Sequence, residues 1–342
     1  MRHHVMTVAV IGAVLGITSC RSDSVTPPSR APEMSPSLSQ ASGPTLVVDN
    51  DLADCPNADF TTIQAAVTAA EPGTTILVCA GSYPEWVVIT KNDLRLLAKG
   101  QPGDVVLDGM NVPGTACAPA NPAALRCAGF ELRNAHGNLI QGFLIRRYWE
   151  AGIWLRMGSS GNTIRKNVTT ESPHHDGIQV AGSNDNVIEH NEATNNPDPS
   201  ACGVNVTAGS QRNVVRHNLA MNNEWGIQIA GATTLANEIF HNEAVHNRGN
   251  GIRNVALASG TIIEDNRAFR NGLTPGPLTG PFASGIRIQS GAGIVVRRNH
   301  AFDNLFFDLR NDGGVATFDN NHCRTSFPPG LCEHTEGESE KN

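Results

Sequence analysis

The chain has 342 residues, of which 17% are charged, 39% hydrophobic and 5% aromatic, and its formal net charge is -7 at pH 7. The 25 Lys and Arg residues are scattered rather than gathered into a stripe, which disfavours a nucleic-acid partner.

The first 20 residues are expected to be an export signal. After a short basic start, an apolar run from Val5 leads to the tetrapeptide Ile17-Thr18-Ser19-Cys20. This tetrapeptide resembles a bacterial lipobox, which implies a lipid anchor at Cys20 in the cell envelope, and Arg21 favours the outer membrane. An ordinary secretory signal is the alternative, and the run is short of the roughly 20 residues of a spanning helix. Residues 21–44, rich in Ser and Pro, are predicted to be a disordered tether.

A short helix is predicted between Asp59 and Glu85. Thr61 and Gln64 form a capping box, and Pro72-Gly73 stops the helix. Such a helix would cover the open end of a solenoid, as solenoid ends require. Its apolar stripe consists of Ile63, Ala66, Val67 and Ala70.

A phrase x-x-[IV]-x-x-N recurs down the second half of the chain. Successive asparagines of this phrase are 22 to 33 residues apart, which is the range of solenoid repeats. The asparagines are Asn167, Asn191, Asn218, Asn242, Asn266, Asn299 and Asn321. A second polar column follows five residues later, at Ser172, Asn196, Asn223, Asn247, Asn271 and Asn304.

A second phrase, G-I-x-[IV], keeps a constant distance of 14 to 16 residues from the next asparagine of the first phrase. Its apolar positions alternate at period two in pieces too short for helices, so we expect strands rather than a helical solenoid. Stacked coils would pair each strand in parallel with its equivalent one coil away, and inward asparagines would form amide ladders. The glycines of the phrase are Gly152, Gly177, Gly203, Gly226, Gly251 and Gly285.

This spacing predicts an all-β fold: a single-stranded right-handed parallel β-helix over residues 45–325, with an N-terminal capping α-helix. A domain of about 280 residues is long for a globule but ordinary for a solenoid, whose core grows along its axis. Residues 326–342 are expected to form a C-terminal cap and an acidic tail.

The repeat N-x-I-x-x-N-x-A-x-x-N followed by G-I-x-[IV] resembles the parallel β-helix repeats of the pectin-lyase-like superfamily, and Asp59–Glu85 resembles the entry segment of many members. The resemblance implies an extracytoplasmic protein that engages a polysaccharide, either as a uronate lyase or epimerase or as a non-catalytic glycan-binding or cell-surface scaffold. A third hypothesis, an accessory protein of metal-cofactor assembly, is disfavoured because Met and His clusters are missing.

The outward residues of the G-I-x-[IV] strands form a column that is the predicted polysaccharide-binding shelf. Amides offer a donor and an acceptor, an indole stacks on sugar faces, and a guanidinium grips a carboxylate at two points. Such polar residues also occupy outward positions without any function. An exposed tryptophan at position 154 is less readily explained in this way. Corner insertions at Pro197–Ala201 and Leu273–Ser284 would wall the shelf. The column consists of Trp154, Gln179, Asn205, Gln228, Arg253 and Arg287.

The candidate catalytic residues lie on two adjacent coils. A lyase or epimerase removes the proton beside a uronate carboxylate, which requires a base and a cation. His175 or Tyr148 is the predicted base, Arg147 or Arg156 the cation, and His174 lies beside them; turn or surface histidines are the alternative. The pair Pro173-His174 is faintly similar to the Asp-Pro-His core of alginate epimerases, with Ser172 in place of the Asp. Hydrolysis is less favoured, because the outward columns hold no pair of acids.

Cysteine usage fits export. Cys202 is left over from the predicted disulfide pairs and is expected to be a packed free thiol rather than a nucleophile. No metal-type spacing occurs, so no cofactor is expected, although Asp176 and Asp185 could contribute one weak Ca²⁺ site. A monomer is the expected state. The predicted disulfides are Cys55 with Cys79, Cys117 with Cys127, and Cys323 with Cys332.

Overall fold

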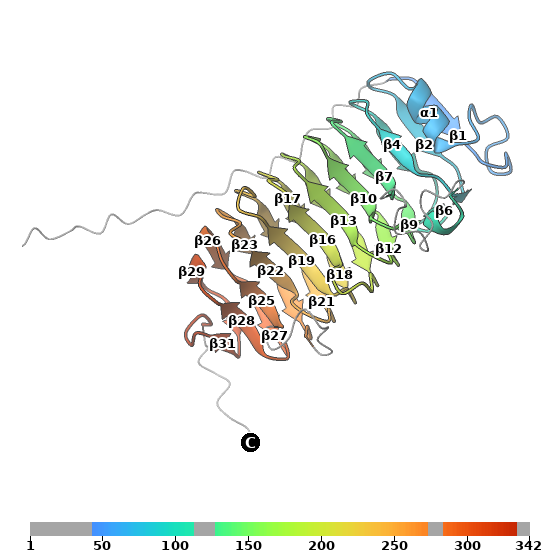
Figure 1. Ribbon diagram of the computed structural model, residues 1–342. Helices are drawn as coiled ribbons and strands as arrows, with labels where there is room; N and C mark the ends of the chain where they lie inside the picture. Colours follow the sequence, from blue (N-terminus) through green and yellow to red (C-terminus); the bar gives the residue numbers. More distant parts are fainter. Residues whose placement is uncertain (1–42, 113–126, 273–282, 334–342) are drawn as a thin grey trace, which may run out of the picture. The chain divides into compact units, whose positions relative to one another are not determined.

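The computed structural model describes residues 43–112, 127–272 and 283–333. In these residues the chain winds through three parallel sheets, and strands that are neighbours in a sheet come from successive coils (Figure 1). The predicted all-β, right-handed parallel β-helix is confirmed. One α-helix, α1 (Ile63–Ala69), and one 3-10 helix, η1 (Gly109–Asn111), accompany the strands that the structure describes.

Within each sheet the strands follow one another as they do along the chain. Sheet A contains β1 (Thr45–Val48), β2 (Thr75–Val78), β5 (Arg95–Ala98), β8 (Leu139–Gln141), β11 (Thr163–Arg165), β14 (Val187–Glu189), β17 (Val214–Arg216), β20 (Glu238–Phe240), β23 (Ile262–Glu264), β26 (Ala292–Arg297) and β29 (Val315–Asp319). Sheet B contains β3 (Gly81–Tyr83), β6 (Val105–Asp108), β9 (Leu144–Arg146), β12 (Val168–Thr170), β15 (Glu192–Thr194), β18 (Leu219–Met221), β21 (Glu243–Val245), β24 (Arg267–Phe269), β27 (His300–Phe302) and β30 (His322–Cys323). Sheet C contains β4 (Val87–Ile89), β7 (Ala128–Arg133), β10 (Ala151–Arg156), β13 (Asp176–Ala181), β16 (Cys202–Thr207), β19 (Trp225–Ala230), β22 (Ile252–Val255), β25 (Ser284–Ile288), β28 (Phe307–Asn311) and β31 (Ser326–Phe327).

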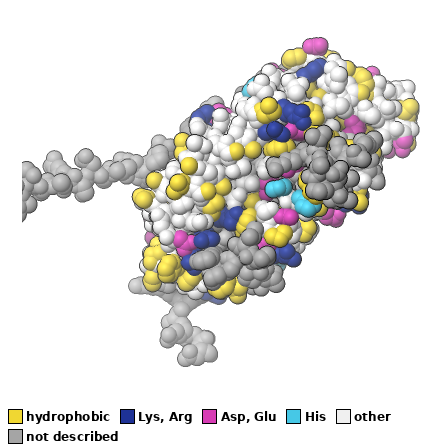
Figure 2. Space-filling model, viewed as in Figure 1, with side chains coloured by type: hydrophobic (Ala, Val, Ile, Leu, Met, Phe, Trp, Pro, Cys, Tyr) yellow, Lys and Arg dark blue, Asp and Glu magenta, His cyan; other side chains and the backbone are white. Residues whose placement is uncertain are grey.

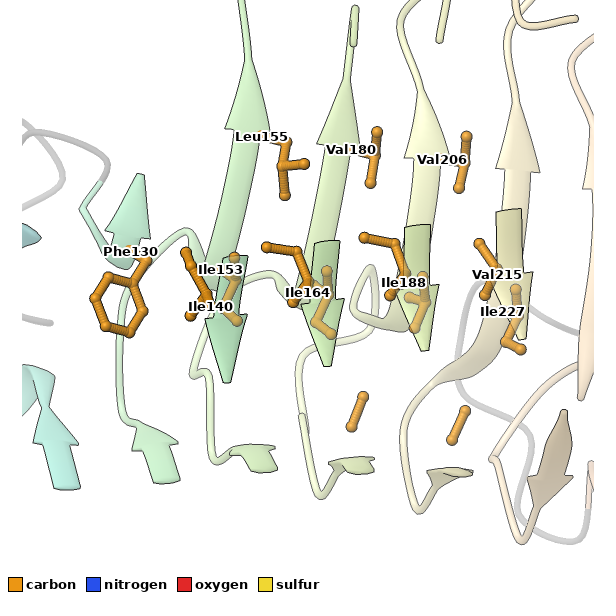
Figure 3. Close-up of a cluster of buried hydrophobic side chains, with 14 of the residues drawn as sticks. Phe130, Ile140, Ile153, Leu155, Ile164, Val180, Ile188, Val206, Val215 and Ile227 are labelled. Carbon is orange, nitrogen blue, oxygen red and sulfur yellow. The ribbon is translucent and has the colours of Figure 1, made fainter. Parts of the chain in front are cut away.

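The interior of the coils is filled by the apolar positions of the two repeated phrases. Ile164 of β11 is paired with Ile188 of β14 in sheet A, and Ile153 of β10 with Ile178 of β13 in sheet C. These four side chains are completely buried, and those drawn in Figure 3 point into the same core. Burying an isoleucine contributes about 1.5–3 kcal/mol, so the stacked aliphatic files supply much of the stability of the solenoid.

The predicted asparagine ladder is confirmed. Asn191 donates from its backbone nitrogen and from Nδ2 to Oδ1 of Asn218, at 2.9 and 3.0 Å, and its Nδ2 also donates to the carbonyl of Ile164 at 2.8 Å. The residue before each of these asparagines has a positive φ, 54° at both His190 and His217, which turns the amide inward. Because the bonds satisfy backbone groups buried at a bend, the ladder fixes the position of each coil on the next between Asn167 and Asn321.

Helix α1 begins differently from the prediction. Its N-cap is Thr62, and the carboxylate of Glu85 accepts the N–H groups of Ile63 and Gln64, both at 2.8 Å. The predicted capping box of Thr61 and Gln64 is wrong, because Thr62 is the N-cap and its Oγ1 accepts the N–H of Ala65 at 3.3 Å, while the carboxylate from a distant turn satisfies the first two N–H groups. The predicted apolar stripe is buried, as expected for a cap.

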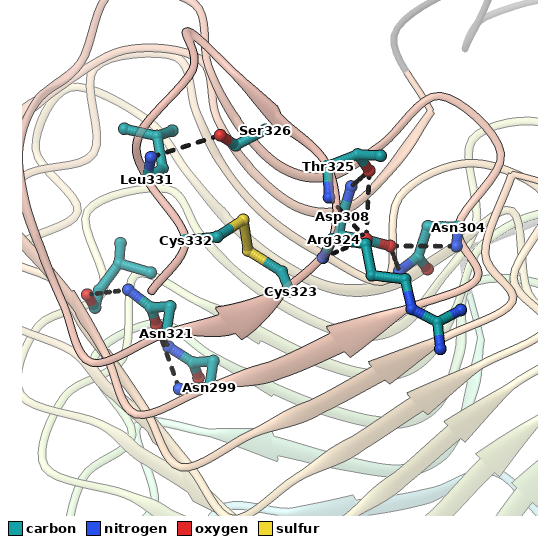
Figure 4. Close-up of a disulfide and its surroundings, with 11 residues drawn as sticks. Asn299, Asn304, Asp308, Asn321, Cys323, Arg324, Thr325, Ser326, Leu331 and Cys332 are labelled. Carbon is teal, nitrogen blue, oxygen red and sulfur yellow. Dashed lines mark hydrogen bonds between the residues drawn. A yellow bond between two sulfur atoms is a disulfide. The ribbon is translucent and has the colours of Figure 1, made fainter. Parts of the chain in front are cut away.

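Two of the predicted disulfides are present: Cys55–Cys79 near the first coils, and Cys323–Cys332 at the last described coil (Figure 4). Cys127 is also disulfide-bonded, and its predicted partner Cys117 lies outside the described residues. The export signal with Cys20, the tether up to residue 42 and the tail from residue 334 lie outside them as well. Among the described helices, none has the length and apolar character needed to cross a membrane.

Candidate functional site

The predicted outward column lies on the outer face of sheet C, and the strand register pairs its members coil by coil. Trp154 is paired with Gln179, and Gln179 with Asn205. Gln228, Arg253 and Arg287 continue the column in the same register.

Two further members of this column were not predicted from the sequence. Glu131 of β7 is paired with Trp154, and Arg310 of β28 with Arg287. The signal for Glu131 was present, because Gly129-Phe130-Glu131-Leu132 matches the G-I-x-[IV] phrase with Phe in place of Ile and Leu in the last position. Glu131 is fully buried and accepts hydrogen bonds from Arg133 and from the Trp86 indole.

A second outward column is formed by the residue that precedes each glycine of the phrase. The register between strands skips the glycine, so that Ala151 is paired with Asp176 and Ile153 with Ile178. Only glycine fits the skipped position, since a Cβ on Gly177 would lie 2.7 Å from the Thr169 hydroxyl and 2.8 Å from a backbone oxygen. Asp176, Cys202 and Trp225 therefore lie beside the first column.

Side chains of the two columns join in a hydrogen-bonded chain that converges on Asp176. Arg253 donates to Oε1 of Gln228, and Gln228 donates to Oδ1 of Asn205 at 3.0 Å. Asn205 then donates to Oδ2 of Asp176 at 2.9 Å, and Gln179 donates to the same oxygen at 3.0 Å. This series of hydrogen bonds thus connects neighbouring coils, through residues that are 23 to 29 positions apart in the sequence.

Asp176 is fully buried, and burial raises its pKa above the ordinary value, although hydrogen bonds from Asn205 and Cys202 and the nearby His175 oppose the shift. The backbone N–H of Cys202 donates to Oδ1 of Asp176 at 2.7 Å. Burial, with Asp176 adding to it, also raises the pKa of the Cys202 thiol well above its usual range. Cys202 is free and buried, which confirms a packed thiol and disfavours a nucleophile.

The weak Ca²⁺ site suggested by Asp176 and Asp185 is wrong. Asp185 lies after the end of β13, where it pairs with Arg212 at 2.7 Å, whereas Asp176 is satisfied by amides on sheet C. Within the described ranges, no three or more His, Cys, Asp or Glu side chains are grouped so that they could hold a metal ion.

The first column is buried rather than an open shelf: Trp154 is 7% exposed, and Gln179, Asn205 and Gln228 are each 8% exposed. The expectation of an exposed indole at Trp154 is therefore wrong, because the guanidinium of Arg156 lies 4.1 Å from its ring centroid. Ala151 packs against the same ring.

Four buried polar atoms on this face have no hydrogen-bond partner in the described part of the chain. They are Nε1 of Trp154, Oε1 of Gln179, Nε1 of Trp225 and Nε of Arg253. Leaving such an atom unpaired costs about 1–3 kcal/mol. Three donors and one acceptor on a single sheet face are the pattern expected where a polar ligand or ordered water completes the hydrogen bonds.

Arg253 provides the cation nearest the centre of this face. Its guanidinium lies 3.2 Å from the ring centroid of Trp225, and burial lowers the pKa of Arg253 to about 10. It therefore keeps its charge at neutral pH. Farther along the column, Arg287 and Arg310 both pair with Asp312, at 2.6 and 2.5 Å.

The structure does not bring the predicted catalytic residues together. Tyr148 is completely buried in the core, where its hydroxyl donates to the carbonyl of Glu85, and burial raises its pKa well above the ordinary value. Arg147 pairs with Asp108 of β6, and Arg156 pairs with Glu131 at 3.2 Å. The prediction that Tyr148 and Arg147 act beside His175 is therefore wrong, because the corner before β10 turns one side chain inward and the other toward sheet B.

His174 and His175 lie in the corner before β13, and both are half-buried. The His174 ring packs 3.3 Å from the ring centroid of Trp149, and its Nδ1 lies 3.7 Å from Oδ2 of Asp198. His175 lies close to Asp176 and partly opposes the rise that burial causes in the pKa of the Asp176 carboxyl. Figure 2 shows histidine side chains next to acidic ones on the face where the strands of sheet C lie.

The family model described as "Right handed beta helix region" matches residues 121–218 and 166–327. These matches cover more than half of the chain, so the protein belongs to the right-handed β-helix family, and its fold is that of the pectin-lyase-like superfamily. No curated protein matches the sequence.

Solved structures with this fold include pectate lyase Pel9A, which is 15% identical, with a TM-score of 0.54 over 86% of this chain and 82% of that one. DFA-IIIase from Arthrobacter chlorophenolicus A6 in complex with DFA-III is 16% identical, with a TM-score of 0.55 over 76% of this chain and 70% of that one. The periplasmic alginate epimerase AlgG is 12% identical, with a TM-score of 0.51 over 77% of this chain and 83% of that one. At these identities the likeness shows the fold alone.

Proposed function

We propose that the protein is an extracytoplasmic β-helix protein that engages a polysaccharide on the outer face of sheet C. The observation that carries this proposal is the group of four unpaired buried polar atoms on Trp154, Gln179, Trp225 and Arg253. Sugar hydroxyls accept from indole and guanidinium N–H groups and donate to an amide oxygen, so one ligand class serves all four atoms. The polysaccharides named for two similar structures, pectate and alginate, lend support.

An acidic polysaccharide fits this face better than a neutral one. Arg253 is charged, and its Nε has no partner among the described residues, so it can bind a uronate carboxylate. Arg156 and Arg287 are held by Glu131 and Asp312 at either side of it. We therefore assign carboxylate recognition to Arg253 in particular.

Export is part of the proposal. The disulfides Cys55–Cys79 and Cys323–Cys332 suit an oxidising compartment. An N-terminal lipid on Cys20 would tether the β-helix to the bacterial cell envelope through residues 21–44, and the protein would act there as a monomer. Metabolic labelling with a fatty acid of the wild type and of Cys20→Ala tests the anchor.

The binding proposal is tested by titrating the purified protein with polygalacturonate, alginate and neutral dextran. Arg253→Gln is expected to lose binding of the two acidic polymers, whereas Arg212→Gln keeps it, because Arg212 is exposed and pairs with Asp185 away from sheet C. Equal affinity of the two variants for the acidic polymers, or no binding by the wild type, would overturn the proposal.

A uronate lyase or epimerase is the second candidate, favoured by the half-buried His175 beside Asp176. As the base, His175 would take the proton from the carbon that bears the carboxylate. In a lyase the resulting electron pair forms the double bond of an unsaturated end and expels the glycosidic oxygen, which takes up a proton from water and leaves as a hydroxyl. In an epimerase a proton returns to the same carbon from the opposite face.

This candidate is tested by incubating the protein with alginate and pectate in deuterated water. Ultraviolet absorption of unsaturated ends, or deuterium at the reacting carbon, is expected in the wild type and not in His175→Asn, while both proteins bind the polymer. If the wild type gives neither signal, the lyase or epimerase candidate is excluded, and a non-catalytic glycan-binding scaffold remains as the function.

A further inference from the structure

Three exposed histidines on consecutive coils form a file at the corner between sheets A and B. They are His190 after β14, His217 after β17 and His241 after β20. Each directly precedes a ladder asparagine and has a positive φ of 53° or 54°. This backbone conformation points the asparagine amide into the core and the histidine toward solvent.

The three imidazole rings stack on one another. The ring centroids of His190 and His217 are 4.8 Å apart with planes inclined by 4°, and those of His217 and His241 are 5.0 Å apart with planes inclined by 22°. Both spacings are close to the distance of about 4.8 Å between neighbouring strands. Because Asn191, Asn218 and Asn242 are hydrogen-bonded in the adjoining positions, the main chain holds the rings in line.

We propose that this histidine file (His190, His217 and His241) binds a divalent transition-metal ion, of the kind that imidazole nitrogen prefers, between two neighbouring rings. Cu²⁺ and Ni²⁺ are suited to such a site, and Cu²⁺ is expected to bind more tightly. The site lies at a different corner from the sheet C face, so it does not depend on the polysaccharide proposal.

The geometry requires only side-chain movement. Two imidazole nitrogens at about 2.1 Å from one ion lie about 3 Å apart, less than the spacing of the ring centroids, so neighbouring rings must tilt toward each other. All three side chains are exposed, so they can tilt on the solvent side. The Phe240 ring packs edge-on against the rings of His217 and His241, with centroids 6.4 and 5.5 Å away. No cluster of three or more potential ligands surrounds a single point in the described residues, so two imidazoles bind each ion and water completes its coordination.

A bound ion would tie one coil to the next. Its ligands come from coils 24 or 27 residues apart in the chain, as the ladder asparagines beside them show. Binding to the folded state alone raises stability in proportion to the logarithm of ion concentration over Kd. Ion binding to the histidine file is thus expected to raise the stability of the central coils against unfolding.

The test compares His217→Asn with His246→Asn in the full chain. His217 is the middle ligand, whereas His246 is exposed with a similar φ of 55° but follows β21, on another file beside Asn222 and Arg270. Asparagine tolerates this left-handed backbone, so both variants keep the local fold. Copper bound elsewhere, such as at the stacked pair His300 and His322 (4.7 Å), is common to both variants and cancels in the difference.

Titration with Cu²⁺ is followed by electron paramagnetic resonance and by thermal unfolding. His246→Asn is expected to match the wild type, while His217→Asn loses one bound Cu²⁺ per chain, its nitrogen hyperfine pattern and the rise in Tm. Equal copper stoichiometry and equal spectra in the two variants would overturn the proposal. Should His217→Asn fail to fold, the double variant His190→Asn/His241→Asn, which leaves a single imidazole in the file, is compared with His246→Asn in the same way.

Discussion

Asn205 donates a hydrogen bond of 2.9 Å to Asp176, so that an amide on one coil holds a completely buried carboxylate on the preceding coil. Gln228 and Arg253 extend this contact over two more coils. The donors all point toward Asp176, so its carboxyl group is linked by hydrogen bonds to the face that carries the unpaired indole, amide and guanidinium atoms. Stability and ligand binding on sheet C are therefore expected to depend on the same side chains.

The first prediction concerns the pH dependence caused by Asp176. Because burial raises its pKa, the folded state binds a proton more tightly than the unfolded state, and stability is lost as the pH rises from about 4 through the raised pKa. Asp176→Asn removes this titration. The Tm of the variant relative to the wild type is expected to increase with pH, measured by thermal unfolding across that range. Asp185→Asn, at an exposed site, is the control, and parallel Tm curves for the wild type and Asp176→Asn would contradict the prediction.

A second prediction concerns the Trp225 indole, whose buried Nε1 lacks a partner among the described residues. Trp225→Phe keeps an aromatic ring under the Arg253 guanidinium but removes the donor. If a polysaccharide hydroxyl accepts from Nε1, affinity is expected to fall about tenfold, which corresponds to roughly 1.4 kcal/mol. Calorimetric titration with the acidic polymers measures this, and Trp149→Phe, at the corner before β10, is the comparison. Unchanged affinity would remove Trp225 from the proposed site.

The third prediction addresses the asparagine ladder. Asn218→Ala removes the acceptor for two donors of Asn191, the backbone N–H at 2.9 Å and Nδ2 at 3.0 Å. Nδ2 keeps its bond to the carbonyl of Ile164, whereas the backbone N–H is left buried without a partner. At about 1–3 kcal/mol per unpaired group, the variant is expected to lose about 3 kcal/mol of unfolding free energy in denaturant titrations. Asn222→Gly replaces an exposed asparagine with positive φ and is the control. A loss no larger than that of the control would show that the ladder does not stabilise the coils.

The fourth prediction concerns the cap of helix α1. Glu85→Ala leaves the N–H groups of Ile63 and Gln64 without their carboxylate acceptor. The helix start is expected to fray, at a cost of about 1–2 kcal/mol, and to become sensitive to limited proteolysis near Thr62. Glu71→Ala, at an exposed position after the helix, should show neither effect. Protection of the helix start in Glu85→Ala equal to that in the wild type would mean that Thr62 alone suffices as a cap.

The architecture was predictable because each coil repeats the same bend and the same strand pattern. A ladder asparagine must satisfy buried backbone groups at a bend, and the positions on either side must alternate between core and surface. Counting from Asn191 or Asn218 therefore located the strands of sheets A and C, and the column from Trp154 to Arg287 was placed correctly in register. Glu131 was not recognised as a member of this column because β7 carries Phe130 where most later coils have Ile.

The candidate site was less predictable, since it depends on corners whose lengths vary. Counting along strands does not reveal that Tyr148 turns into the core or that Arg147 reaches Asp108. Nor does it show that Trp154 is covered by Arg156. The histidine file had a signal in the sequence, the residue before three successive ladder asparagines, but its meaning depended on knowing that these residues turn outward on adjacent coils.

The coaxial winding of this protein follows from its amino-acid periodicity alone, because residues repeated at coil spacing contact mainly their own equivalents. Tertiary packing, in contrast, determines which side chains meet across the corners: Asp176 with Asn205, Glu85 with the start of α1, and His190 with His217. The physical reason is that a corner residue's direction is set by backbone torsions and by packing against the neighbouring coil, neither of which follows from the residue's own identity.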